Sequence, residues 1–245
     1  EELHISTQLS KARSTIKIQD GCNQYCTYCI IPFTRGKIRS RSPESVLAEV
    51  RGLALKGYHE IILTGIHLGS YGKDLEQVYL IDLIEALDQI DGIKRIRLGS
   101  LEPNLVTKEL LDRLVTCPSV CDHFHLSMQS GSDTVLGRMK RHYTSQDYFD
   151  KVQLIRRYYK NPAITTDVIV GFPMETEKEA LETYQFVEKV RFSDAHVFKY
   201  SIREGTKAAE MKPQINGKIK RQRRKELTEL TTKLHMDYID IFINK

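Results

Sequence analysis

The sequence predicts one α/β domain built on a parallel sheet, and three observations support this. The chain has 245 residues, a length at which an α/β barrel is routinely a single domain. Short apolar, β-branched runs alternate with longer segments of helical period, which is typical of a parallel sheet. Polar clusters follow several of the short runs, and ligand sites of parallel α/β folds gather where the strands end.

Six strand candidates follow one another along the chain. They are "STIKIQ" near residue 16, "EIILTG" near 62, "RIRLGS" near 97, "HFHLSMQ" near 125, "AITTDVIVGF" near 168 and "AHVFKYS" near 198. Six strands fall short of the eight that close a full barrel. The pattern alone therefore leaves two architectures, an open, incomplete barrel and a doubly wound sheet.

Segments of helical period separate the strand candidates, at 42–56, 80–90, 107–115, 145–159 and 178–190. In the first of them, Ser42 and Pro43 stand at the N-cap and the first helical position, which these residue types favour. Near residue 213 a basic loop leads into a last amphipathic helix. We therefore expect an N-terminal linker (1–13), a core domain (14–212), and a basic linker with a C-terminal helix (213–245).

Composition excludes some classes of protein. No apolar run reaches the ~20 residues of a bilayer span, and the first residues lack the pattern of a signal peptide. Five cysteines are too few for a disulfide scaffold in this length, so we expect reduced thiols and a cytoplasmic protein. The net charge is +5, with cationic residues dense at 35–41 and 218–225. These stretches indicate a polyanionic partner or, alternatively, solvated loops and helix faces.

Three of the five cysteines, Cys22, Cys26 and Cys29, stand within eight residues at the spacing C-x3-C-x2-C. A structural zinc site normally has four ligands, so a distant residue such as His67 would have to complete one. Three buried structural thiols are a further alternative. Iron–sulfur clusters ordinarily take four cysteinates, so three would leave one iron of a 4Fe-4S cluster open for chemistry. The sequence favours this last interpretation.

The remaining cysteines, Cys117 and Cys121, lie close to two histidines, His123 and His125. This grouping superficially resembles a metal site. Isolated cysteines usually behave as small buried hydrophobic residues, and His125 falls in a strand candidate. We therefore expect no second cluster there.

The cysteine spacing resembles the signature of the radical S-adenosylmethionine (SAM) enzymes, and the resemblance covers nearly the whole chain. The stretches "KIQDGCNQYCTYCIIPFTRGKIRSR", "LTGIHLGSYG", "QSGSDTVLGRMKR" and "TTDVIVGFPMETEKE" are similar to the methylthiotransferase branch of that superfamily. Within the branch they are most like the enzymes that methylthiolate N6-threonylcarbamoyladenosine in tRNA. The resemblance implies an open (βα)6 partial TIM barrel.

The resemblance also implies a transferase activity and its cofactors. The three cysteines would hold a 4Fe-4S cluster, SAM would bind its open iron, and the cluster, reduced by an electron donor, would cleave SAM to a 5′-deoxyadenosyl radical. Such enzymes replace the hydrogen at carbon 2 of the adenine beside the anticodon with a methylthio group. We expect a second 4Fe-4S cluster in an N-terminal domain, and an RNA-binding domain after the last helix, both outside these residues.

Candidate SAM contacts lie in and after the predicted strands. The Gly-Gly-Glu motif of many superfamily members is missing after the second strand, and Met174 replaces the glycine usual in the "GFPxET" turn. Each candidate is equally suited to a capping or structural hydrogen-bonding role. The candidates are Tyr28, Thr64, Gly65, Ser100, Glu102, Gln129, Ser130 and Asp167.

The cationic residues Arg35, Lys37, Arg39 and Arg41 directly follow the cysteines, and we expect them to contact tRNA phosphates. The alternative is that they face solvent or pack within the protein. We expect tRNA and an electron donor as partners, and neither membrane nor DNA. Rival hypotheses are sister enzymes that act on isopentenyladenosine in tRNA or on a ribosomal protein aspartate, and a zinc-dependent RNA-binding module without catalysis.

Overall fold

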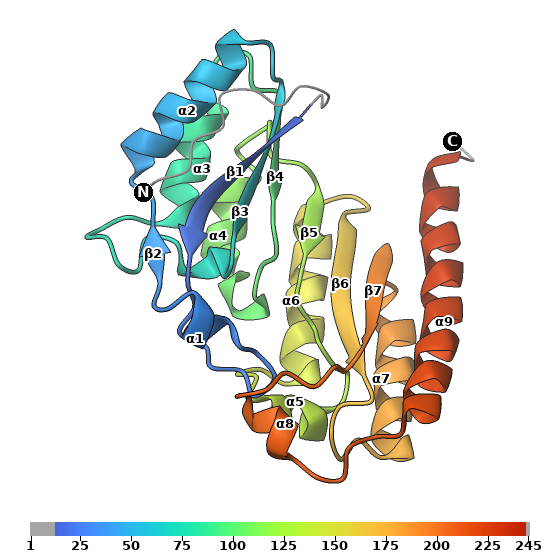
Figure 1. The fold of residues 1–245 in the computed structure, drawn as a ribbon. Helices are drawn as coiled ribbons and strands as arrows, with labels where there is room; N and C mark the ends of the chain where they lie inside the picture. The colour runs from blue at the N-terminus through green and yellow to red at the C-terminus, as the bar shows by residue number, and fades with distance from the viewer. Residues whose placement is uncertain (1–12, 244–245) are drawn as a thin grey trace. The chain divides into compact units, whose positions relative to one another are not determined.

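The computed structural model describes residues 13–243 and shows a mixed α/β fold (Figure 1). Two compact units make up the chain. Within the described residues, unit 1 comprises 13–23, 31–125 and 154–162, and unit 2 comprises 24–30, 126–153 and 163–243. None of the described helices is both long enough and apolar enough to cross a bilayer.

Unit 1 contains a four-stranded sheet with the strand order β2-β1-β3-β4. Strands β1 and β3 pair in parallel, as do β3 and β4, whereas the short β2 runs antiparallel to β1. The strands of this unit are β1 (Arg13–Asp20), β2 (Arg39–Ser40), β3 (Glu60–Gly65), β4 (Arg95–Leu98) and β5 (His123–His125). Its helices are α1 (Ile31–Thr34), α2 (Pro43–Leu55), η1 (Leu68–Ser70), α3 (Leu80–Asp88), η2 (Pro103–Leu105) and α4 (Lys108–Leu114).

The core of unit 1 lies between this sheet and its helices. In β1, alternate residues point to the same face, and Ile16 and Ile18 are fully buried. Ile16 is in register with Leu63 of β3, which is also fully buried. Burial of one such side chain stabilises the fold by roughly 1.5–3 kcal/mol. Helix α3 contacts both α2 and α4, and Figure 1 shows the three helices beside β1, β3 and β4.

The start of α2 confirms the prediction from sequence. Ser42 is the N-cap, its hydroxyl accepts a hydrogen bond from the Ser45 backbone, and Pro43 is the first helical residue. This cap satisfies one of the backbone N–H groups that every helix leaves without a partner inside the helix. Thr107 caps α4 in the same way.

Unit 2 is built on the parallel pair β6 (Ala163–Val170) and β7 (Asp194–Lys199), which are in register from Thr165 and Asp194 onwards. In β6 every second residue is buried, which gives the strand one core face and one partly exposed face. Helix α9 packs along β7 and contacts α7, as Figure 1 shows. The helices are α5 (Asp133–Met139), α7 (Glu177–Val190), α8 (Lys207–Glu210) and α9 (Gly217–Ile243), while α6 (Ser145–Tyr158) contributes to both units.

All six predicted strands and the five predicted internal helices are present, with ends shifted by at most a few residues. The sequence did not predict β2, α5 or the short helices α1, α8, η1 and η2. Strand β2 has two residues and forms only through its pairing with β1. Helix α5 has seven residues and lies between the three-residue β5 and the longer α6. The division at residues 13 and 212 stays a prediction.

Candidate functional site

The loop that begins with Cys22 is held by the turn at Gly36 and Lys37. The Cys22 backbone N–H donates to Gly36 O at 3.1 Å. Gly21, just before it, has a φ of 71°, and a Cβ at this position would lie 1.9 Å from Lys37 O. Only glycine fits this close approach, so the residue before the first cysteine is dictated by the backbone path.

Gln19 fixes the end of β1 against the end of β3. Its side-chain amide donates to Gly21 O at 2.7 Å, and its Oε1 accepts from the His67 backbone at 2.8 Å. A Cβ on Gly65, one of the candidate residues, would lie 2.7 Å from Gln19 Oε1. The absence of a side chain at Gly65 therefore lets the Gln19 side chain pack against the end of β3. Sequence reasoning did not identify Gln19, because nothing in the pattern marks a buried amide.

The other candidates of unit 1 also lie where β3 and β4 end. Thr64 donates its hydroxyl to Ile16 O at 3.3 Å, a contact within the sheet. The two ring nitrogens of His67 contact different side chains. Nε2 lies 2.8 Å from the Glu102 carboxylate, and Nδ1 lies 2.6 Å from Ser70 Oγ. Ser100 is exposed. Thus Thr64, Ser100 and Glu102 share one region of unit 1, and Glu102 is held in place by a histidine.

In unit 2, Cys26 and Cys29 belong to one tight turn. The Cys29 backbone N–H donates to Cys26 O at 3.0 Å. Thr27 docks this turn on the end of α5, because its backbone donates to Met139 O at 3.1 Å and its hydroxyl donates to Arg138 O at 2.8 Å. The "GRMKR" stretch thus supports the cysteine turn directly.

Tyr28, a candidate SAM contact, is partly buried and packs against a hydrophobic core cluster of unit 2. Its ring meets Phe172 edge-on with the centroids 6.4 Å apart. Burial raises the pKa of the Tyr28 hydroxyl well above its ordinary value. The buried residues of this hydrophobic core cluster are Val135, Met139, Phe172, Tyr200 and Ala208.

Gln129 and Asp167 lie side by side at the partly exposed face of β6. The Gln129 backbone donates to Asp167 O at 2.9 Å, and Gln129 has a φ of 71°. The Asp167 carboxylate lies 3.5 Å from His196 Nδ1 of β7. Ser130 differs from both, because it is fully buried with its hydroxyl 3.1 Å from Thr183 Oγ1 of α7. Its surroundings favour the structural role over ligand contact.

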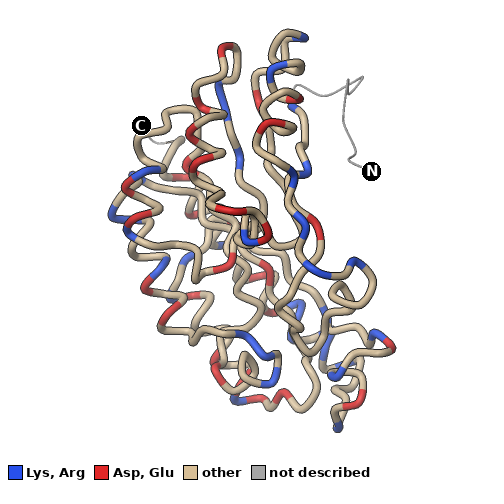
Figure 2. Tube along the Cα trace, turned by 90° about the vertical axis from the view of Figure 1, so that its left-hand side faces the viewer, with Lys and Arg blue, Asp and Glu red and all other residues tan. Residues whose placement is uncertain are grey.

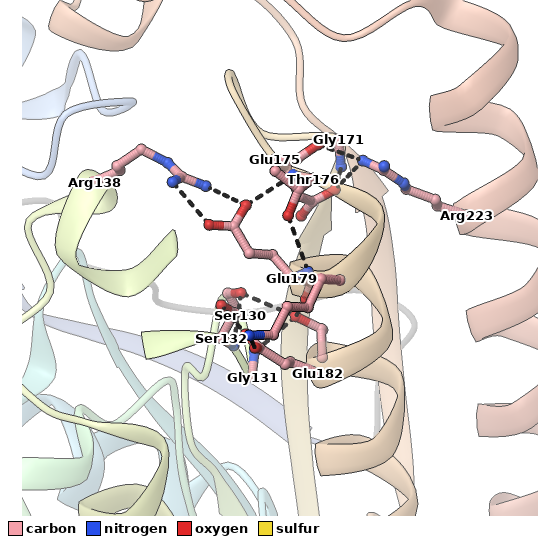
Figure 3. A network of polar contacts seen from close by, with 12 residues as sticks. Ser130, Gly131, Ser132, Arg138, Gly171, Glu175, Thr176, Glu179, Glu182 and Arg223 are labelled. Atoms are coloured by element: carbon pink, nitrogen blue, oxygen red, sulfur yellow. Dashed lines mark hydrogen bonds and ion pairs between the residues drawn. The ribbon is translucent and has the colours of Figure 1, made fainter. Parts of the chain in front are cut away.

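A network of charged residues holds the loop after β6, which contains Met174 (Figure 3). Arg138 of α5 donates to both carboxylate oxygens of Glu179, at 2.9 and 2.8 Å. Glu175 accepts from the Gly171 backbone and from Arg223 of α9, each at 2.7 Å. Burial nevertheless raises the pKa of the Glu175 carboxyl above its ordinary value. The loop is therefore fixed to α9 through Glu175 and to α7 through the Thr176 backbone, which donates to Glu179, and Glu179 in turn holds α5 through Arg138.

The donor chemistry of the cysteines suits iron. None of the three forms a disulfide, and each is partly exposed. Across residues 13–243, however, no group of three or more His, Cys, Asp or Glu side chains lies close enough together to hold a metal ion. Cys22 belongs to unit 1, whereas Cys26 and Cys29 belong to unit 2. The convergence of all three thiols on one cluster stays a prediction.

The four cations predicted to contact RNA differ in their surroundings. Arg39 is 59% exposed and lies 3.6 Å from Asp20, whereas the Arg41 side chain is only 10% exposed and donates to Glu49 at 2.7 Å. The Arg39 guanidinium donates hydrogen bonds to the backbone carbonyls of Arg35 and Lys37. Figure 2 shows Lys and Arg interspersed with Asp and Glu along the trace. The geometry of Arg41 therefore favours the alternative that it packs within the protein.

Cys117 and Cys121, which were expected to be structural, differ from the three motif cysteines in their surroundings. Cys117 is buried, and burial raises the pKa of both thiols. Cys117 Sγ lies 3.6 Å from Arg113 O. These surroundings suit the structural role expected from the sequence.

Comparisons with known proteins agree with the fold and with the motifs. The family model of the radical SAM superfamily matches residues 16–187. A solved radical SAM methyltransferase, TsrM from Kitasatospora setae, superposes with a TM-score of 0.67 at 17% identity, over 80% of this chain and 38% of that chain. Methylornithine synthase (PylB) superposes with a TM-score of 0.60 at 10% identity, over 92% and 68%. These structures confirm the predicted open barrel.

Curated relatives are more similar in sequence. The threonylcarbamoyladenosine tRNA methylthiotransferase MtaB of Bacillus subtilis is 42% identical over 100% of this chain and 54% of its own length. A tRNA-2-methylthio-N(6)-dimethylallyladenosine synthase of a Thermoanaerobacter species is 44% identical over 97% and 50%. The chain thus spans about half the length of the curated relatives it matches. Fold, motifs and matches together show that the chain belongs to the radical SAM superfamily.

Proposed function

We propose that this chain is the radical SAM core of a tRNA methylthiotransferase, acting at carbon 2 of N6-threonylcarbamoyladenosine beside the anticodon. The observation that carries the proposal is the match of the whole chain to the relative of that name, at 42% identity. The C-x3-C-x2-C motif and the turn that positions its second and third cysteines support it.

Cys22, Cys26 and Cys29 would hold a 4Fe-4S cluster with one open iron. The cluster, once reduced, supplies the reductive cleavage of SAM. The backbone of the chain orients the ligands, since Gly21 sets the path into Cys22 and Thr27 fixes the turn of the other two. Within unit 1, Thr64, Gly65, Ser100 and Glu102 are proposed to lie near SAM, and within unit 2 Tyr28, Gln129 and Asp167 take this role.

The substrate would reach the site as an unpaired base in a tRNA loop, the form in which RNA bases are usually recognised. Arg35, Lys37 and Arg39 are the proposed phosphate contacts. Each phosphate contact makes the affinity for tRNA fall more steeply with salt concentration. Neutralising Lys37 and Arg39 together should therefore reduce the salt dependence of tRNA binding. We further propose a cytoplasmic location and a separate electron donor. Since only five cysteines are present, a second cluster would need ligands outside these residues.

A sister activity on dimethylallyladenosine is the second candidate, because relatives named for it match at 40–44% identity. The deciding experiment is mass analysis of tRNA nucleosides from cells lacking the gene, with the gene restored as the control. Loss of 2-methylthio-N6-threonylcarbamoyladenosine, with its precursor accumulating, is the expected result. Loss of the methylthio group from dimethylallyladenosine alone would replace the first candidate by the second. Normal levels of both nucleosides would contradict a tRNA substrate.

A further inference from the structure

Arg141 is a charged residue in contact with a cysteine of the motif, and no role was assigned to it above. It follows directly after Lys140, the residue that ends α5. Its guanidinium Nη1 donates to Cys26 Sγ at 3.4 Å. This distance lies within the range of a hydrogen bond to sulfur, and the donor carries a full positive charge.

Several contacts hold the Arg141 guanidinium in this position. Its Nε donates to Tyr143 Oη at 3.0 Å, and its Nη2 lies 3.5 Å from Ser127 O. The Tyr143 hydroxyl in turn contacts Ser127 O and Met128 O, each at 2.7 Å. The guanidinium carbon also lies 5.0 Å from the centre of the Tyr143 ring. The side chain is therefore fixed before any ligand binds.

The acceptor is fixed to the same element as the donor. The turn of Cys26 is docked on the end of α5 through Thr27, whose backbone donates to Met139 O at 3.1 Å. The backbone of Arg141 donates to Leu136 O, one turn back in α5, at 2.9 Å. One helix end thus sets both partners of the contact, which is the arrangement that keeps a hydrogen bond short without reorganisation.

A cation beside a cysteinate ligand changes the energy of electron transfer to a cluster. Hydrogen bonds to the sulfurs and nearby charge are among the factors that set cluster reduction potentials. Because reduction adds a negative charge, a fixed positive charge stabilises the reduced form more than the oxidised form. The potential is therefore higher with the cation in place.

We propose that Arg141 is a positioning residue that donates a hydrogen bond to the Cys26 thiolate of the bound 4Fe-4S cluster and raises the reduction potential of that cluster. The electron itself comes from a one-electron reductant. The inference rests on the cluster site proposed above. It assigns a function to the second arginine of "GRMKR", whereas the first, Arg138, pairs with Glu179.

The test compares wild type with Arg141→Gln, Arg141→Lys and the control Lys140→Gln, after anaerobic reconstitution with iron and sulfide. Lys140→Gln removes the same charge from the neighbouring exposed residue. The measurements are iron content and the midpoint potential of the cluster, obtained by redox titration followed by electron paramagnetic resonance. Neither depends on turnover.

We expect Arg141→Gln to lower the midpoint potential, Arg141→Lys to lower it less, and Lys140→Gln to leave it unchanged. A tenfold shift in the reduction equilibrium corresponds to about 59 mV for a one-electron couple. If Arg141→Gln takes up no iron, Arg141→Lys decides, and a potential equal to wild type then overturns the inference. An equal shift in Lys140→Gln also overturns it, since the effect would not need the contact. Wild type without iron would instead contradict the cluster site itself.

Discussion

Two arginines in one basic stretch show how the surroundings of a residue decide its role. Arg41 donates to the Glu49 carboxylate at 2.7 Å and to Ser45 Oγ at 2.9 Å, and both charged side chains are almost fully buried. Arg39, two residues earlier, is largely exposed. The sequence shows two cations of the same kind, because burial depends on Glu49, which reaches Arg41 only when α2 has formed.

Arg41→Ala should destabilise the fold. Removing one partner of a buried pair leaves the other charge without compensation, which typically costs about 3–5 kcal/mol. Arg39→Ala should change the free energy of unfolding by less than about 1 kcal/mol, as is usual for exposed ion pairs. Denaturant unfolding followed by circular dichroism measures both. Equal stability of the two variants would contradict the structural role of Arg41.

Met174 adopts a backbone conformation that favours glycine, with a φ of 65°. A left-handed conformation costs a non-glycine residue about 1–2 kcal/mol, whereas the greater freedom of glycine in the unfolded chain offsets part of the gain. Met174→Gly should therefore stabilise the protein by up to about 1 kcal/mol. Met236→Gly, the same change in the exposed part of α9, should destabilise it by a similar amount. A melting temperature lowered by both changes would contradict this account.

At the scale of elements, charged side chains join helices of unit 2 that are far apart in the sequence. Arg138 joins α5 to α7 through Glu179, and Arg223 joins α9 to the loop after β6 through Glu175 (Figure 3). Lys220 of α9 also donates to Tyr200 O at 3.0 Å. Part of the basic stretch at 218–225 therefore serves internal packing. The charge of this stretch, read from the sequence alone, was equally compatible with a polyanionic partner.

The Arg138–Glu179 pair should make stability depend on pH. Hydrogen bonds from Arg138 lower the pKa of the Glu179 carboxyl below its ordinary value of about 4.3. A lowered pKa contributes stability that is fully present above the unfolded value and is lost as the pH falls through the folded value. The free energy of unfolding of wild type should exceed that of Glu179→Gln at pH 7, and the difference should shrink below about pH 4.

Glu177→Gln is the matched control, since Glu177 is an exposed carboxylate in the same turn of α7. Its difference from wild type should stay small over the same pH range. A Glu179→Gln difference that stays constant down to pH 3 would mean that the ion pair adds nothing to the stability of the folded state.

For the whole molecule, the sequence predicted the six strands, the five internal helices and the family, because alternating periods and the cysteine motif are local signals. It did not identify Gln19 or Arg141, whose contacts join segments distant in the sequence. It also grouped Ser130 with Gln129, although the Ser130 hydroxyl turns out to face Thr183 of α7 in the core. Adjacent residues at the end of a strand point in opposite directions, and the sequence does not reveal which one faces a ligand.

The most direct test of the account is the metal content of the reconstituted chain together with its cleavage of SAM. Wild type, Cys117→Ala and Cys121→Ala should each bind about four irons and form 5′-deoxyadenosine under reducing conditions. Cys22→Ala, Cys26→Ala and Cys29→Ala should each lose the cluster and this product. Stoichiometric zinc without iron–sulfur absorbance in the wild type would contradict the radical SAM assignment of the site, and loss of the cluster in Cys117→Ala or Cys121→Ala would contradict the choice of ligands.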